Sequence, residues 1–145
     1  MSGERQAVAI FCDDVRQEVN GKLSFMGCYA GVMEVASFPL IAPKLVVFVR
    51  ASTMASKPFK RLTVRVLNGD ELVGEGDVPS GAIAKGAQRR KGVTAEEQLD
   101  LEVHVHLVFA PLSIMHPCTL RAYVETEDGE MSAGRLVVRA RASNV

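Results

Sequence analysis

The segment Gln98 to Phe109 alternates apolar and polar residues almost without interruption. Its odd-numbered positions are apolar, whereas its even-numbered positions include Glu102, His104 and His106. Because successive side chains of a β-strand point to opposite faces of a sheet, this pattern predicts a strand with one face in a core and one face toward water. Such a strand is typical of an antiparallel sheet.

Short β-branched runs separated by Gly, Pro and Asn recur along the rest of the chain, without an internal repeat. The length of 145 residues fits one domain. We therefore predict a single all-β domain over residues 1–145, an antiparallel β-sandwich (immunoglobulin-like or similar) of seven to nine strands. The predicted strands are Ala7–Cys12, Val15–Val19, Leu23–Met33, Lys44–Ala51, Phe59–Leu67, Glu71–Val78, Gln98–Phe109, Cys118–Thr126 and Met131–Ala140.

One predicted strand differs from the others, because Leu45 to Val49 is apolar on both faces. This indicates a central strand, or a strand covered by a loop or a partner. The turn signals Asn20-Gly21, Asn68-Gly69 and Asp128-Gly129 lie between predicted strands, and the parity of the flanking apolar residues favours three-residue loops that end in glycine. We expect positive φ at these three glycines, and the cross-strand pairs Val15–Phe25, Val64–Leu72 and Leu120–Leu136.

Seventeen basic and seventeen acidic residues cancel, so no field of the whole molecule attracts it to nucleic acid or to an anionic membrane. The first apolar run, Ala7 to Cys12, is too short for a signal-peptide core or a membrane span. These observations predict a cytoplasmic protein without membrane contact. The three cysteines, Cys12, Cys28 and Cys118, lie far apart and are expected to be small buried apolar residues rather than zinc ligands or a redox pair.

The stretch from Pro79 to Glu97 carries no strand pattern and contains several basic residues. A loop of this length is either functional or a solvated hairpin tip. As a functional loop it could bind phosphates or an acidic protein face, but it has no aromatic residue to stack on bases. Nucleic-acid contact is thus expected only locally, if at all. The basic residues are Lys85, Arg89, Arg90 and Lys91.

His104 and His106 project from one face of their predicted strand, together with Glu102, and could share a metal ion. A closed metal site needs three or four ligands, and no neighbouring strand can be placed to supply the rest. We therefore assign these three residues to a binding face and expect neither metal nor cofactor.

A thiol nucleophile would require a histidine that lowers the pKa of the thiol, and Cys118 does lie near His116 in the sequence. The intervening Pro117 instead indicates a turn into a strand. The chain also lacks the common phosphate-binding, serine-hydrolase and zinc-protease motifs, so no catalytic residue is assigned.

Asp13, Asp14 and Arg16 follow a buried strand and precede a predicted hairpin. Short carboxylates at such places accept backbone N–H bonds in turns. The functional alternative is a paired-carboxylate site for acid–base chemistry or a divalent cation. The turn interpretation needs no additional partner and is preferred.

The string from Ala9 to Arg16, which contains Cys12-Asp13-Asp14, is followed by Asn20-Gly21-Lys22, Gly27-Cys28-Tyr29, Phe38-Pro39 and Pro43-Lys44-Leu45. These segments resemble a family of small bacterial β-sandwich domains of unknown function, with the signature F-C-D-D-x-R and N-G-K. The resemblance is specific over about the first fifty residues. It implies a compact bacterial β protein with no reaction or ligand attached, and it suggests that the Cys12-Asp13-Asp14 turn is a hallmark of folding or of function.

These patterns favour a non-catalytic cytoplasmic module that binds another protein through a sheet surface or through loops. The first alternative is a structural capsid, neck or tail component of a phage or prophage-derived particle. The second alternative is a metal- or thiol-dependent hydrolase. Homo-oligomerisation is left open by the sequence.

Overall fold

The computed structural model of the chain describes residues 4–88 and 100–142. Within these residues the protein is all-β, apart from one α-helix, α1 (Ser80–Gln88), and one 3-10 turn, η1 (Val19–Gly21). The strands are β1 (Gln6–Cys12), β2 (Asp14–Gln17), β3 (Leu23–Met26), β4 (Val32–Val35), β5 (Leu40–Ala42), β6 (Leu45–Met54), β7 (Leu62–Asn68), β8 (Glu71–Val78), β9 (Asp100–Phe109), β10 (Leu112–Ile114), β11 (Cys118–Thr126) and β12 (Gly129–Ala140).

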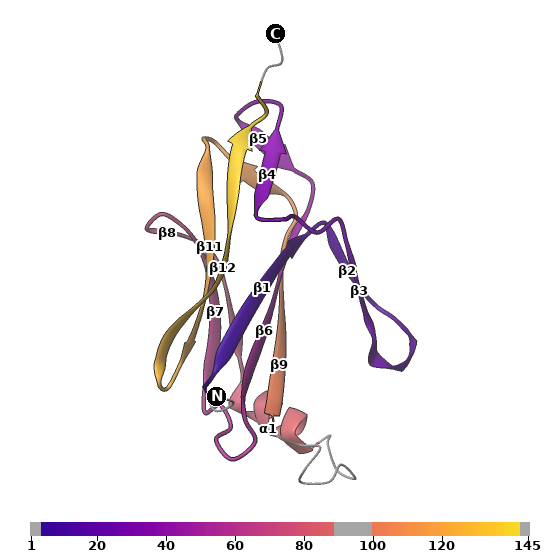
Figure 1. Cartoon of the computed structure of the whole chain (residues 1–145), viewed down its shortest axis with the longest axis vertical. Coiled ribbons are helices and arrows are strands. Elements are labelled where there is room, and N and C mark those ends of the chain that lie inside the picture. Colours follow the sequence, from indigo (N-terminus) through magenta and orange to yellow (C-terminus); the bar gives the residue numbers. More distant parts are fainter. Residues whose placement is uncertain (1–3, 89–99, 143–145) are drawn as a thin grey trace.

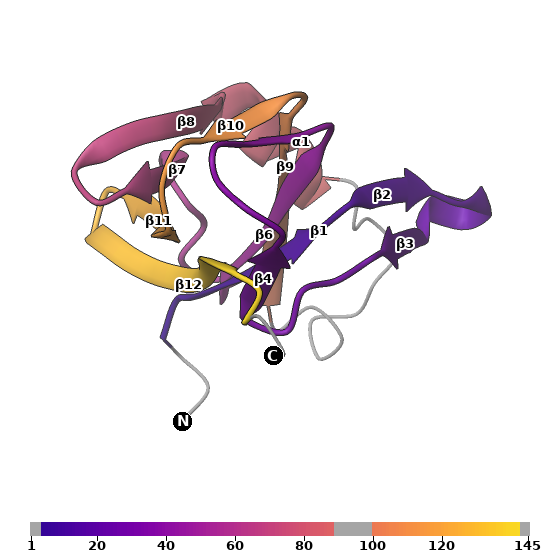
Figure 2. The same cartoon turned by 90° about the horizontal axis from the view of Figure 1, so that it is seen from above.

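Two larger sheets face each other and share one apolar core (Figure 1). One contains three antiparallel strands in the order β1-β6-β9, and the other contains five in the order β4-β12-β11-β7-β8, with β4 parallel to β12. The β2–β3 hairpin projects beside the three-stranded sheet (Figure 2). The most deeply buried side chains include Leu45, Val47, Val49, Leu62, Val64, Val66, Leu120, Val124, Leu136 and Val138.

Strand β9 has the two faces that its alternating sequence predicts. Its odd-numbered residues from 101 to 109 belong to the core or pack against it, whereas Glu102, His104 and His106 are exposed on the outer face of the sheet. Strand β6 is the central strand of its sheet, as the two-sided apolar character of Leu45 to Val49 predicts. Its outer side chain Phe48 is buried as well, because Phe25 of β3 packs on its ring.

The predicted strand from Leu23 to Met33 is wrong as one continuous strand, because only its two ends form strands, in β3 and β4. The chain leaves the sheet direction after Met26, and Gly27 and Gly31 both adopt positive φ, at 63° and 87°. Strand β4 then joins the opposite sheet beside β12. The short pair β5–β10 was not predicted either, so the twelve strands of the described residues exceed the predicted seven to nine.

Helix α1 corrects the prediction of an unpatterned stretch after Pro79. The helix begins with hydrogen bonds from the N–H groups of Ala82 and Ile83 to the Pro79 carbonyl, at 2.9 and 3.2 Å, and Ile83 is buried in the core. One large apolar side chain among Ala and Gly residues gives no helical period in the sequence. Lys85 lies on this helix, whereas Arg89, Arg90 and Lys91 lie outside the described residues.

The three turn glycines have the positive φ that the sequence predicts: 74° at Gly21, 62° at Gly69 and 120° at Gly129. The predicted pairs Val15–Phe25 and Leu120–Leu136 are confirmed. In the β11–β12 hairpin Thr126 lies opposite Gly129, so the loop has two residues rather than the predicted three, and the register shift lies between Ala122 and Tyr123, away from the turn.

The predicted pair Val64–Leu72 is wrong. Val64 lies opposite Gly76, and Leu72 lies opposite Leu67. Asn68 lies opposite Glu71, so the loop has two residues, Gly69 and Asp70, and the predicted three-residue loop is wrong. The register shifts between Val66 and Leu67, inside the ladder.

Arg5 anchors the start of β1 to two loops on the neighbouring strands. Its side chain is only 8% exposed, and its guanidinium lies 4.7 Å from the centre of the Phe59 ring. Its nitrogen atoms contact Glu127 Oε1 at 2.8 Å, Thr53 Oγ1 at 3.1 Å, Thr126 Oγ1 and the Pro58 carbonyl at 3.2 Å, and Asp128 Oδ2 and the Lys57 carbonyl at 3.3 Å. No sequence pattern predicts this cluster, because its members lie far apart in the chain.

No helix within the described ranges combines the length and the apolar character that crossing a bilayer requires.

Candidate functional site

We use the term arm for residues 14–26, which comprise β2, η1 and β3 (Figure 1). The base of the arm is tied to the body through Asp13, the residue between β1 and β2. The Asp13 N–H donates to the Met26 carbonyl at 2.9 Å, and the Tyr29 hydroxyl donates to Asp13 Oδ1 at 3.0 Å. The Tyr29 N–H in turn donates to the Phe11 carbonyl at 2.9 Å. Burial, followed by this hydrogen bond to Asp13, raises the pKa of Tyr29.

The next carboxylate, Asp14, binds cations of the same chain. Lys44 Nζ donates to Asp14 Oδ1 at 2.7 Å, and Arg16 Nε lies 3.6 Å from Asp14 Oδ2. The hydrogen bond from Lys44 is the main reason that the pKa of Asp14 is lowered. The Cys12 thiol donates to the Asp14 carbonyl at 3.5 Å, and burial raises the pKa of Cys12 to about 11.

Gly27 completes this arrangement, since it has a left-handed φ and lies against Asp13. A Cβ atom at this position would collide with the Asp13 carboxylate. We call the set Asp13, Asp14, Gly27, Tyr29 and Lys44 the arm joint. Its contacts explain why three of the recognised sequence segments occur together, because they meet at one place in the fold. Asp13 accepts from the Tyr29 hydroxyl and Asp14 mainly from Lys44, whereas the turn interpretation predicted backbone N–H donors.

A hollow of about 240 Å³ lies between the arm and the outer face of the three-stranded sheet. We call it the arm groove. Its walls are mainly apolar, and its polar residues come from β6 and β9. The ring centres of Phe25 and Phe48 lie 4.8 Å apart with an edge-to-face geometry. The lining residues are Val8 and Ile10 of β1, Leu23 and Phe25 of β3, Phe48 and Arg50 of β6, and Glu102 and His104 of β9.

The three residues predicted as a binding face meet at this groove or beside it. His104 Nε2 lies 3.2 Å from Glu102 Oε2, and Arg50 Nη1 lies 4.0 Å from Glu102 Oε1. The rings of His104 and His106 lie 5.2 and 5.0 Å from that of Phe48. Burial, and secondly the charge of His104, lowers the pKa of His106.

The arm side of the groove does not follow from the sequence pattern. Leu23 and Phe25 lie in the long predicted strand, and nothing in that pattern indicates that they fold over β6. The sequence feature that could have predicted a covering segment is the apolar outer face of β1 and β6. The two-sided apolar run from Leu45 to Val49 is only one part of that face. Within residues 4–88 and 100–142, no three His, Cys, Asp or Glu side chains are grouped so that they could hold a metal ion.

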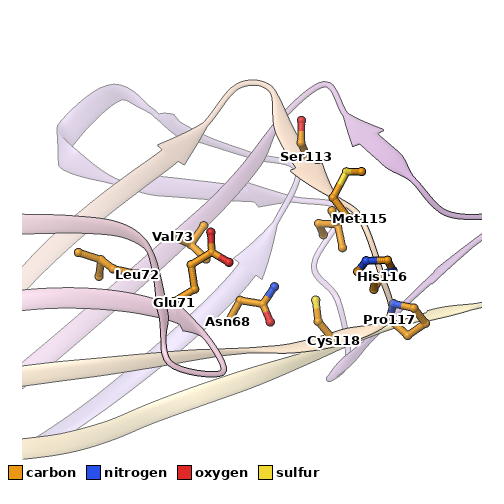
Figure 3. A pocket seen from close by; sticks show the side chains of 10 residues that line it. Asn68, Glu71, Leu72, Val73, Ser113, Met115, His116, Pro117 and Cys118 are labelled. Carbon is orange, nitrogen blue, oxygen red and sulfur yellow. The ribbon is translucent and has the colours of Figure 1, made fainter.

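A second hollow, of about 500 Å³, lies at the end of the molecule (Figure 3). We call it the end cleft. Asn68, Glu71, Leu72 and Val73 from the β7–β8 turn form one side, and residues 113–118 form the other. It contains the His116 and Cys118 pair of the nucleophile hypothesis. Burial raises the pKa of Cys118, so its thiol is protonated at neutral pH, which is unfavourable for a nucleophile.

The exposure of Cys28 and the raised pKa values of Cys12 and Cys118 predict the order in which the cysteines react with a thiol reagent at pH 7.5. Exposed Cys28 should react first, and Cys118 more slowly. Buried Cys12 should react about a hundredfold more slowly than an ordinary exposed thiol, because its pKa is about 11. Absorbance at 412 nm with an aromatic disulfide reagent measures the phases, and Cys28→Ser should remove the fast one. A fast phase that disappears in Cys118→Ser would instead favour the thiol-hydrolase hypothesis.

The fold and the groove define an all-β protein with a projecting, anchored arm. A family model described as a family of unknown function, DUF6941, matches residues 7–139. The chain therefore belongs to this family. The matched range contains the whole arm joint and every residue that lines the arm groove. A comparison with curated proteins finds no match.

Proposed function

We propose that the protein is a non-catalytic binding module, a β-sandwich that engages another polypeptide through the arm groove in the bacterial cytoplasm. The observation that carries this proposal is an apolar hollow with a polar rim on the outer face of the three-stranded sheet. Val8, Ile10 and Leu23 supply apolar wall, whereas Arg50 and Glu102 supply charge at the edge. An apolar centre surrounded by polar residues is the usual anatomy of a protein–protein contact.

The size of the hollow supports a protein partner rather than a small ligand. Its volume of about 240 Å³ is below the range of roughly 300–1,000 Å³ that small-molecule and cofactor sites occupy. It can take an anchoring side chain of a partner. Such anchors supply most of the binding free energy at protein interfaces.

The chemistry of the neighbouring residues supports a role without catalysis. Asp13 and Asp14 contact Tyr29 and Lys44 of the same chain, and the pKa values of Cys12 and Cys118 are raised. No feature of the described residues favours the phage-particle or hydrolase alternative. Lys85 and the basic residues that follow α1 remain a predicted second contact for an acidic protein face.

Site-specific photo-cross-linking tests the proposal. A benzophenone amino acid at Val8, which is 47% exposed in the groove, should cross-link to a discrete polypeptide in living cells. The same group at Ile41, which is 69% exposed on β5, is the matched control and should not. Mass spectrometry of the cross-linked peptide identifies the partner. Identical products at both positions, or none at Val8, would contradict the proposal.

Once the partner is purified, Val8→Asp should weaken its binding about tenfold or more, because a charge replaces an apolar contact in the groove. The free energy of unfolding should change by less than about 1 kcal/mol, since the side chain is half exposed. Isothermal titration calorimetry and urea denaturation measure the two effects. Ile41→Asp should leave the affinity unchanged.

A further inference from the structure

The arm presents an apolar side chain at its tip. Val19 is 80% exposed, the highest value among the exposed large hydrophobic residues of the described chain. A two-stranded ribbon is marginally stable by itself in water, and the contacts that hold this arm to the body lie at its joint and at Phe25. The tip extends beyond these contacts and holds the Val19 side chain away from the body (Figure 1).

Two opposite charges flank Val19. Glu18 and Lys22 face each other across the tip, where the Glu18 N–H donates to the Lys22 carbonyl at 2.7 Å. Neither side chain forms an ion pair with another residue that the structure describes. The tip therefore offers an apolar residue between an acid and a base.

The arm groove has the complementary pattern. Its apolar walls lie beside Arg50 from β6 and Glu102 from β9, which lie 4.0 Å apart in one chain and would exchange partners with the tip charges on binding. We propose that the polypeptide bound in the groove is the arm tip of a second copy of this chain, with Val19 in the hollow, Glu18 near Arg50 and Lys22 near Glu102. This inference rests on the proposed function, because it names the occupant of the same groove.

The tip cannot occupy the groove of its own chain. Leu23 and Phe25 of the same arm already form one wall of the hollow. The arm leaves the end of β1 and diverges from the sheet toward its tip in both views (Figures 1 and 2). A copy related by a two-fold axis brings its tip to this groove from the opposite direction. The exchange is then reciprocal and closes as a dimer, with two identical contacts.

Sedimentation velocity over a range of concentrations tests this inference on the full chain. The wild-type protein should sediment as a dimer at about 100 µM, and Val19→Asp should raise the dimer dissociation constant about tenfold or more. Met115→Asp is the matched control, because Met115 is also strongly exposed but lies at the end cleft. It should leave the dissociation constant unchanged.

Charge exchange tests the pairing itself. Glu18→Lys and Arg50→Glu should each weaken the dimer, whereas the double variant should recover part of the loss. A mixture of ¹⁴N- and ¹⁵N-labelled protein with a photo-cross-linker at Val19 should give mixed-isotope products joined to peptides of β1 or β6. Products that are isotopically pure would place the contact within one chain and overturn the inference.

A monomer at about 100 µM would overturn self-association, as would a dimer that tolerates both Val19→Asp and Val8→Asp. These results are distinguishable from a failure of the proposed function. If the protein is monomeric but Val8 cross-links to a different polypeptide, the groove binds a foreign partner and only the present inference is wrong. If Val8 cross-links to nothing, both are wrong.

Discussion

Replacing Arg5 with alanine is expected to lower the free energy of unfolding by about 3 kcal/mol, because a mostly buried carboxylate loses its cation and two buried hydroxyl groups each lose a hydrogen bond. Glu127 loses its closest cation, at 2.8 Å, and buried Thr53 and Thr126 lose the guanidinium that joins them. Urea denaturation should show a lower midpoint with an unchanged slope. Arg5→Lys keeps the charge but not the planar fork of donors, so it should recover only part of the stability.

The same cluster predicts how this stability depends on pH. The hydrogen bond from Arg5 is the main reason that the pKa of Glu127 falls to about 2 from its usual value near 4.5. A carboxyl group with a lowered pKa in the folded state contributes stability that is complete above its unfolded pKa and is lost as the pH falls through its folded pKa. The difference between wild type and Arg5→Ala should therefore be full at pH 6 and decrease below about pH 4.5. A difference that stays constant from pH 6 to pH 3 would contradict the assignment to Glu127.

The second large effect is expected at the arm joint. Gly27→Ala should lower the free energy of unfolding by about 3 kcal/mol, because the substitution combines an unfavourable left-handed φ with a collision against Asp13. The displaced carboxylate should also lose its hydrogen bond to Tyr29. Nuclear Overhauser contacts between Phe25 and Phe48 should weaken as the base of the arm shifts.

Gly31→Ala separates the two causes. Gly31 has a φ of 87°, but a Cβ atom there meets nothing within 4 Å, so this variant should lose only about 1 kcal/mol. The double variant Asp13→Ala with Gly27→Ala removes the obstructing side chain and should lose less than the sum of its single variants. Equal losses for Gly27→Ala and Gly31→Ala would assign the whole effect to backbone conformation.

The parts of the fold that the sequence predicts are those in which one strand face is uniformly apolar. The alternation in β9 and the two-sided apolar run in β6 determine burial locally, because the period of side-chain direction is fixed at two. The end of strand β3 at Met26 could not be predicted from the apolar pattern, because apolar residues continue on both sides of Gly27 and Gly31. The bend at Gly27 brings it against Asp13, which is distant in sequence, so this contact has no local signal.

Part of the candidate site is also predictable from the alternating direction of side chains along one strand. Glu102, His104 and His106 belong to one strand, so their common face follows from their spacing. The arm groove combines four strands, and its depth depends on how far the arm folds over Phe48. The position of the arm over Phe48 is set by the arm-joint contacts of Tyr29 and Lys44, and these residues lie in loops rather than in periodic segments.

The arm joint also has a consequence for protein engineering. Its five residues lie at the base of the arm, whereas the turn of Val19, Asn20 and Gly21 lies at the other end and contributes no buried side chain. The arm joint thus holds the arm in place without any contribution from the tip. A short peptide inserted between Asn20 and Gly21 would be displayed away from the body while the core and the arm joint keep their contacts, so it would block the tip without disturbing the fold.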